Sequence, residues 1–338
     1  MNKIITEAVW GKTADGHDVQ RHTISNGKLS VSLIDLGATV QRIIYNGLDM
    51  ALSFPDPGLY ERISKGCIGA TVGRYAGRIA GGKCSIDGAA YQLTQNQNGN
   101  HLHGGEHGFH TKLWKSEIID GEGVRFSLFS PDGEEGYPGN LNVSVVYRVT
   151  DDNSLEITFN AASDKDTILN LTNHSYFNPN GFEINFPDFR TTPSTDNSDT
   201  ELQIHADRVL ELDGDIPTGK LLPVDGTQFD FRSRRPLTSD IREIPGKTLG
   251  GFDHTFAFSP HEPEQPVAEA IGRKSGVKIA FFTDQPGAQL FTMGNPGIAF
   301  AFEAQHFPDS PHHPGFPSTV LRAGDVFRSR TIYRFSKE

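Results

Sequence analysis

The chain has 338 residues, a formal net charge of −11 and a pI near 5.6. Because it has no basic run to neutralise phosphates, we do not expect it to bind nucleic acid. No apolar stretch approaches the roughly 18 residues that a membrane span needs, so no membrane segment is expected either. The N-terminus lacks the apolar region of a signal peptide, and two cysteines fit idle thiols in a reduced compartment, which favours the cytoplasm.

The predicted elements are strands from one end of the chain to the other. Thirty-six glycines and 20 prolines indicate many turns, and period-2 alternation of apolar residues recurs in residues 28–37, 141–149, 155–159 and 326–335. Residues 151–154 (DDNS) form a turn signal, so 141–149 and 155–159 are predicted to form an antiparallel hairpin. The proline-rich, acidic segment 259–270 is interpreted as a surface loop. We therefore expect one all-β domain over residues 1–338, a large β-sandwich of two antiparallel sheets.

Four histidines lie close together in NHLHGGEHGFHTKLW, residues 100–114. His101 and His103 would point to the same side of a strand, with Glu106 following, which approaches the H-x-H-…-E pattern of metal-binding β-barrels. His107 and His110 stand in loop-like surroundings, and no second shell of ligand-orienting residues can be read from the sequence. Three interpretations stay open: a metal site, a polar loop, and hydrogen bonding to a substrate by one of the histidines. The last is favoured.

Two segments place polar side chains at the end of a strand-like apolar run. Residues 168–181 (ILNLTNHSYFNPNG) contain Asn173, His174, Ser175, Tyr176 and Asn178, which suit a ligand rich in hydroxyl groups, with His174 as a proton carrier. A polar strand end with no ligand explains the same residues equally well.

The second such segment is residues 297–311 (GIAFAFEAQHFPDSP), in which Glu303 follows alternating phenylalanines and alanines. A desolvated carboxylate at this position has a raised pKa and is a candidate general base. A glutamate that simply reaches solvent at a strand end is the alternative.

Arginine and aspartate residues near glycine-rich segments could hold neighbouring hydroxyl groups. Residues 71–82 (TVGRYAGRIAGG) carry two arginines four positions apart, and Asp253 precedes an aromatic strand in residues 250–258. Taken singly, each is more typical of a structural ion pair. The glycine spacing matches neither a P-loop nor a dinucleotide-binding turn, and no nucleophile elbow is present.

Taken together and in this order, these segments resemble the aldose 1-epimerase (galactose mutarotase) family. The matching blocks are GATVQRI, GRYAGRIAGG, NHLHGG, GFHTKLW, DGEEGYPGNL, LTNHSYFN, GFDHTF, PGAQLFT and FEAQHFPDSP with GFPSTVLRAGD, which begin near residue 37 and reach residue 325. The family fold is a β-sandwich with an open cleft, which agrees with the strand pattern.

The resemblance implies an isomerase that interconverts the anomers of a free aldohexose, galactose or glucose, without a cofactor or metal. It implies that Glu303 is the general base and His174 the general acid. The implied sugar-binding residues are Arg78, His103, Tyr176, Asn178, Asp253 and Gln289. The expected partner is a monosaccharide, and the expected assembly is a monomer or homodimer.

The sequence departs from the family pattern at Gly77, where asparagine is usual, so one sugar-directed amide is missing and hydroxyl preference is expected to differ. His110 stands where aspartate is common. Two alternatives stay open within the fold. One is a sugar-binding domain without activity, and the presence of both Glu303 and His174 counts against it. The other is an epimerase for a phosphorylated hexose, for which the arginines of residues 231–236 (FRSRRP) are the candidate phosphate ligands, although a solvated turn is the favoured interpretation.

Overall fold

Two large antiparallel sheets make up most of the computed structural model, which describes residues 3–182, 197–238, 251–293 and 298–338. Within these residues the larger sheet has eleven strands. In spatial order they are β1 (Lys3–Lys12), β2 (Asp18–Ser25), β3 (Leu29–Ile34), β4 (Thr39–Tyr45), β5 (Leu48–Ala51), β17 (Tyr176–Phe182), β26 (Ala299–Gln305), β25 (Gly287–Met293), β22 (Asp253–Ala257), β19 (Arg208–Asp213) and β20 (Ile216–Pro223).

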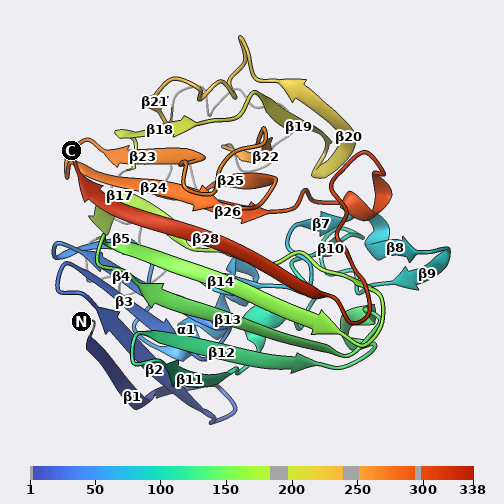
Figure 1. The fold of residues 1–338 in the computed structure, drawn as a ribbon, viewed down its shortest axis with the longest axis horizontal. Helices are drawn as coiled ribbons and strands as arrows, with labels where there is room; N and C mark the ends of the chain where they lie inside the picture. Colours follow the sequence, from blue (N-terminus) through green and yellow to red (C-terminus); the bar gives the residue numbers. More distant parts are fainter. Residues whose placement is uncertain (1–2, 183–196, 239–250, 294–297) are drawn as a thin grey trace.

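The second sheet has nine strands in the described part of the chain. In order they are β11 (Lys115–Ile119), β12 (Gly123–Ser130), β13 (Leu141–Val149), β14 (Ser154–Ser163), β28 (Val326–Lys337), β24 (Val277–Thr283), β23 (Ala268–Gly272), β18 (Thr200–Ile204) and β21 (Arg235–Pro236). In Figure 1 the C-terminal strand β28 runs between β14 and β24 across the middle of the molecule. The prediction of a two-sheet, all-β fold is confirmed.

Short elements join these sheets. Four two-stranded pairs occur among the described residues: β6 (Thr71–Val72) with β16 (Thr172–Asn173), β7 (Arg78–Ile79) with β10 (His101–Leu102), β8 (Lys83–Ile86) with β9 (Ala89–Gln92), and β15 (Thr167–Ile168) with β27 (Val320–Leu321). Within the described ranges the helical elements are α1 (Pro57–Arg62) and the 3₁₀ turns Ser64–Gly66, Ala80–Gly82, Phe109–Thr111, Glu134–Gly136 and Ser310–His312. In the part of the chain that is described, no helix has both the length and the apolar character to cross a membrane.

The predicted hairpin shows why the sequence forms these sheets. Strands β13 and β14 pair antiparallel, with Val145 opposite Phe159 and Tyr147 opposite Ile157. These four side chains are buried in one core cluster. Alternate residues of β13 are more exposed, so one face of the hairpin is apolar, as a half-buried antiparallel sheet requires.

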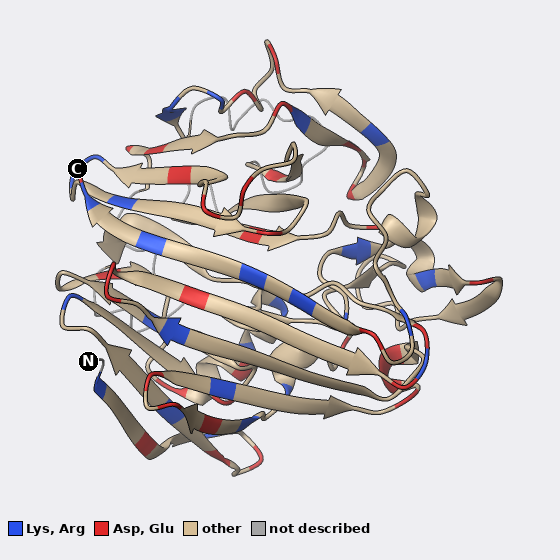
Figure 2. Ribbon diagram, viewed as in Figure 1, with Lys and Arg blue, Asp and Glu red and all other residues tan. Residues whose placement is uncertain are grey.

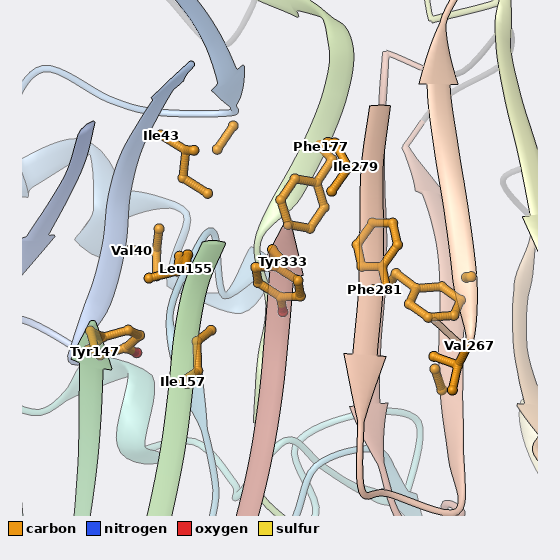
Figure 3. Close-up of a cluster of buried hydrophobic side chains, with 14 of the residues drawn as sticks. Val40, Ile43, Tyr147, Leu155, Ile157, Phe177, Val267, Ile279, Phe281 and Tyr333 are labelled. Carbon is orange, nitrogen blue, oxygen red and sulfur yellow. The ribbon is translucent and has the colours of Figure 1, made fainter. Parts of the chain in front are cut away.

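The main core lies between the two sheets. Phe177 of β17 packs edge-on against Tyr333 of β28 and Phe281 of β24, with ring centroids 5.0 Å and 5.5 Å apart (Figure 3). Phe300 and Phe302 of β26 are buried in the same cluster. Because successive side chains on a strand point to opposite faces, the intervening residues of β26 must lie on the face turned away from the second sheet.

Charged side chains of both signs are interspersed along the strands (Figure 2). The two cysteines, Cys67 and Cys84, are buried and do not form a disulfide. Burial raises the pKa of the Cys84 thiol to about 11 and raises that of Cys67 further. Both are therefore inert thiols near neutral pH.

Candidate active site

Three neighbouring strands bring the predicted polar residues together. In the pairing of β25 with β26, Gln289 lies opposite Glu303. In the pairing of β22 with β25, Asp253 lies opposite Phe291 and Thr255 opposite Gln289. Cross-strand partners share a face of the sheet, so Glu303, Gln289 and Asp253 all lie on the face away from the main core. The strand register assembles these residues from segments up to 50 positions apart.

Glu303 is the most deeply buried charged group of this cluster, with 2% of the residue exposed. Its Oε1 lies 3.4 Å from His174 Nε2, and its Oε2 is buried with no hydrogen-bond partner among the described residues. Burial raises the pKa of the Glu303 carboxyl well above its usual range. The nearby Asp253 carboxylate raises it further, and Arg78 acts in the opposite direction. This carboxyl group is suited to accept a proton near neutral pH.

His174 is held by its backbone and by two aromatic rings. Its N–H donates to the Ala70 carbonyl at 2.9 Å, and its own carbonyl accepts from Gly69 N–H at 2.9 Å. The imidazole stacks on Tyr176, with centroids 4.7 Å apart and 24° between the planes, and meets the edge of Phe291 at 6.4 Å. Burial lowers the pKa of His174 to about 4, so the free imidazole is neutral at pH 7.

Tyr176 and Asn178 support the site within the protein. The Tyr176 hydroxyl donates to the Gly66 carbonyl at 3.0 Å while its ring lies under His174. The Asn178 side chain is fully buried. Its amide donates to the Ile298 carbonyl at 3.5 Å and its oxygen accepts from Asn180 N–H at 3.0 Å. Both residues share the face that carries Glu303, and their direct contact with a sugar stays a prediction.

The backbone around Gly77 fixes the orientation of His103. The two residues exchange hydrogen bonds: His103 N–H donates to the Gly77 carbonyl, and Gly77 N–H donates to His103 Nδ1, both at 3.2 Å. Because Nδ1 accepts, the neutral ring carries its proton on Nε2, which leaves a donor for a ligand. Burial lowers the pKa of His103 well below its usual value, and the neighbouring His174 and Arg78 lower it further.

The turn that carries His103 depends on a close backbone approach. His103 itself has a left-handed conformation (φ 52°), and Gly104 follows with φ 85°. A Cβ atom at Gly104 would lie 1.7 Å from the Gly73 carbonyl oxygen, so no other residue fits this position without a shift of the chain. The glycines of the HLHGG block therefore place the His103 ring, whose centroid lies 5.5 Å from that of His174.

Arg78, Asp253 and Gln289 form one hydrogen-bonded group at the more exposed side of the cluster. Arg78 Nη2 lies 3.5 Å from Asp253 Oδ2, and the Gln289 amide donates to Asp253 Oδ1 at 2.5 Å. Arg78 Nε also donates to Gln97 at 2.7 Å, and Thr255 donates its hydroxyl to Gln289. The Arg78 and Asp253 side chains are 15% and 18% exposed, against 3% for that of Glu303. Polar groups thus extend from the buried pair of Glu303 and His174 to the partly exposed Arg78 and Asp253, which form the rim of the site.

The resemblance implies a sugar-binding role for His103 and leaves the other three histidines of residues 100–114 as loop residues, an expectation that is wrong for His101. His101 lies in β10 and is fully buried. Its Nδ1 contacts the Thr94 carbonyl at 2.7 Å and its Nε2 contacts the Tyr137 hydroxyl at 2.5 Å. Since both nitrogens are engaged, a metal site built on His101 and His103 does not fit. His110, in the turn Phe109–Thr111, is partly buried, and its pKa is lowered to about 4. His107 is exposed.

A different trio has the composition of a metal site. One ligand atom each from His103, His174 and Glu303 lie within 4.8 Å of one another. Two imidazoles and a carboxylate suit several transition metals. Two of these groups, Glu303 and His174, are also the pair that a proton transfer needs, and His103 beside them can donate a hydrogen bond to a ligand.

Sequence reasoning missed two side chains that shape this cluster. Phe291 provides an apolar edge against both His174 and Tyr176. The alternation of residues 286–292 (PGAQLFT) predicts that Phe291 lies on the same face of the strand as Gln289. Gln97, which holds the Arg78 guanidinium, lies in a turn whose sequence carries no comparable signal.

Solved structures place this architecture in the class of galactose mutarotase-like β-sandwich proteins. Galactose 1-epimerase from Lactobacillus acidophilus NCFM superposes with a TM-score of 0.82 at 27% identity, over 100% of this chain and 99% of that one. An aldose epimerase homologue from C. elegans gives a TM-score of 0.79 at 27% identity and the same coverage.

Sequence comparison gives the particular family. The chain is 34% identical to galactose mutarotase of Homo sapiens, over 98% of both chains. It is also 34% identical to aldose 1-epimerase of Escherichia coli K12, over 96% of this chain and 97% of the relative. The aldose 1-epimerase family model matches residues 20–334. The chain belongs to the aldose 1-epimerase family and is an isomerase of this class.

Proposed function

We propose that this epimerase acts on a free aldohexose, galactose or glucose, with Glu303 and His174 as the proton-transferring pair. The observation that carries the proposal is the buried contact of 3.4 Å between His174 Nε2 and Glu303 Oε1. The relatives named galactose mutarotase and aldose 1-epimerase support the choice of substrate class.

The reaction requires one proton to leave the sugar and another to reach it. In the reactive form of the pair, its one shared proton lies on His174 and Glu303 is ionised. Glu303 takes the proton of the anomeric hydroxyl while His174 gives its proton to the ring oxygen, and the C1–O5 bond breaks to give the open-chain aldehyde. Rotation about C1–C2 presents the other face of the carbonyl, and ring closure reverses both transfers. A positioned acid or base typically contributes 10²–10⁴-fold to the rate.

The remaining polar groups would hold the hydroxyls that do not react. Arg78 supplies donors, Asp253 supplies acceptors and His103 supplies an Nε2–H donor, so a sugar bound at the rim would meet groups of each kind. Gln289 orients Asp253 through its 2.5 Å hydrogen bond. Fixing these hydroxyls would leave C1 as the mobile centre, which lowers the entropic part of the barrier.

Neither alternative function gains support from the geometry. A sugar-binding domain without activity has no need of a buried acid–base pair. The candidate phosphate ligands are engaged elsewhere. Arg232 lies 2.6 Å from both Asp225 and Asp230, and Arg234 lies 3.0 Å from Glu338. Arg235 donates to the Gln228 carbonyl and lies over the Phe231 ring. A phosphate would have to displace these partners.

We assign the protein to the cytoplasm and to hexose metabolism, as one domain over residues 1–338 that acts as a monomer or homodimer. Two buried thiols that do not pair, Cys67 and Cys84, fit a reducing compartment. Strands from both ends of the chain share the two sheets, which supports a single domain.

Polarimetry on freshly dissolved α-anomers tests the proposed function. Galactose, glucose, xylose and fucose are compared with glucose 6-phosphate, and the spontaneous rate is subtracted from each. Acceleration of galactose or glucose above the phosphorylated sugar is expected. Acceleration of glucose 6-phosphate alone would replace the proposal by its phosphohexose alternative, and acceleration of none would reject it.

The pH dependence of kcat/KM is expected to be a bell whose limbs belong to the Glu303–His174 pair. The active pair holds one proton in total. Because the pKa of His174 is lowered to about 4, the second proton binds only at acid pH, which sets the acidic limb. Because the pKa of Glu303 is raised, its proton leaves at higher pH and sets the basic limb. The sequence alone predicts the reverse order, in which the carboxyl sets the acidic limb and the imidazole sets the basic limb. A basic limb that disappears in His174→Asn and not in Glu303→Gln would support that reverse order.

His103→Asn is expected to raise KM by about fivefold to tenfold with little change in kcat. The variant loses a neutral hydrogen bond that the substrate makes in both ground and transition states, worth about 1 kcal/mol. His107→Asn is the matched control, since this exposed histidine of the same segment should leave both constants unchanged. A lower melting temperature for His103→Asn with unaltered kinetics would make His103 a structural residue.

A further inference from the structure

The hairpin of β19 and β20 brings one more carboxylate to the rim of the site. Its strands follow β22 in the larger sheet, and Asp213 pairs with Ile216, so Gly214 and Asp215 form a two-residue turn. Gly214 has φ 59°, and a glycine with positive φ at the first central position suits the tight turn of a hairpin. Asp215 Oδ2 lies 4.0 Å from Arg78 Nη2, and no step of the proposed mechanism uses this carboxylate.

A buried carboxylate ties the hairpin to the backbone of Arg78. Asp309 is 2% exposed, and its N–H donates to the Arg78 carbonyl at 2.8 Å. His313 Nε2 lies 3.2 Å from Asp309 Oδ2 and 3.1 Å from the carbonyl of Pro217 in β20. The turn that carries Asp215 is thus held near Arg78 by contacts other than the ion pair between these two residues.

Exposure increases along the contacts that lead from the acid–base pair to this turn. The Glu303 side chain is 3% exposed, those of Arg78 and Asp253 are 15% and 18% exposed, and that of Asp215 is 38% exposed. The same Arg78 nitrogen faces Asp253 at 3.5 Å and Asp215 at 4.0 Å. Because a long, exposed ion pair contributes little to stability, the pairing with Arg78 does not by itself account for Asp215. Its carboxylate is accessible to a ligand at the outer end of the site.

We propose that Asp215 accepts a hydrogen bond from a sugar hydroxyl on C3 or C4, at the end of the ring opposite the anomeric carbon. The inference rests on the proposed function. Glu303 and His174 act on O1 and the ring oxygen, so C1 lies at the buried end of the site. In a six-membered ring C4 is opposite C1 and C3 is next to C4, so their hydroxyls lie toward the exposed end. A carboxylate has enough lone pairs to accept from a hydroxyl and still face Arg78.

The test compares glucose with its 2-deoxy, 3-deoxy and 4-deoxy analogues in the parent protein and in Asp215→Ala. The variant is expected to raise KM about tenfold for glucose and for 2-deoxyglucose with little change in kcat, because C3 and C4 do not react and the contact is the same in the ground and transition states. KM for one of the other two analogues should stay nearly unchanged, since that sugar lacks the hydroxyl that Asp215 contacts. Asp215→Asn keeps an acceptor oxygen and should show a smaller increase.

Asp151→Ala is the matched control, since Asp151 is an exposed aspartate in the turn between β13 and β14 of the other sheet and should leave all four KM values unchanged.

Three results would overturn the inference. An equal rise in KM for all four sugars would make Asp215 a structural partner of Arg78, no rise for glucose would remove it from the site, and an unchanged KM for 2-deoxyglucose alone would place it near C1. If Asp215→Ala fails to fold, the parent protein decides, because equal KM values for glucose and for the 3-deoxy and 4-deoxy analogues exclude the contact. Turnover of no sugar by the parent protein would instead reject the proposed function.

Discussion

Glu303→Gln is expected to lower kcat by about 10²–10⁴-fold while sugar binding stays measurable. Glutamine keeps the size of the side chain and its ability to hydrogen-bond, but it cannot accept the proton of the anomeric hydroxyl. Turnover is measured by polarimetry with the spontaneous rate subtracted, and galactose binding is measured by titration calorimetry. Near-normal turnover in this variant would rule out Glu303 as the base.

The stability of the same variant separates a chemical defect from a folding defect. The pKa of the Glu303 carboxyl is higher in the folded protein than in the unfolded chain, so protonation of this group stabilises the fold. This stabilisation is complete below the unfolded pKa and is lost as the pH rises through the folded pKa. Glutamine does not ionise, so it does not lose this contribution. Glu303→Gln should therefore melt at least as high as the parent protein at alkaline pH, and a lower melting temperature there would assign the activity loss to misfolding.

His174→Asn is expected to lower kcat by a similar factor, and the double variant with Glu303→Gln should be little worse than the worse single one. The ring oxygen would leave without a proton once the imidazole is gone. Residues that act in one concerted step show strongly non-additive losses. Polarimetry of the parent protein, the two single variants and the double variant gives the four kcat values of a double-mutant cycle. If the loss of kcat in the double variant equals the product of the two single losses, the two groups act in separate steps.

Tyr176→Phe is the control for His174→Asn. It keeps the ring on which His174 stacks and removes only the hydroxyl that donates to the Gly66 carbonyl. Its effect on kcat should be small. A loss as large as that of His174→Asn would point to a structural role for this part of the site.

Most of the fold could be predicted because the sandwich is built from local alternation. The hairpin of residues 141–149 and 155–159 needed only the apolar period and a turn between its strands. By contrast, the neighbours of a strand in a large sheet are set by non-local contacts. Nothing local in the sequence says that β17 lies between β5 and β26, yet this order puts His174 beside Glu303.

The site could be predicted only in part, for a related reason. The polar residues within 168–181 and 297–311 could be recognised because they follow strand-like apolar runs. The resemblance to the aldose 1-epimerase family then assigned them to one site. His101 could not be separated from His103 by pattern, because its burial depends on Tyr137, which lies 36 residues away. Asp215 gave no signal, since an aspartate in a tight turn has no special meaning until the fold places it beside Arg78.

Magnetisation exchange between the anomers of C1-labelled galactose at equilibrium measures directly whether the protein interconverts them through Glu303. A true epimerase accelerates the exchange in both directions and leaves the ratio of α to β unchanged. The exchange rate is expected to rise in proportion to the concentration of the parent protein and to fall to the spontaneous value with Glu303→Gln. An exchange rate that the parent protein does not change, or that Glu303→Gln raises equally, would contradict it.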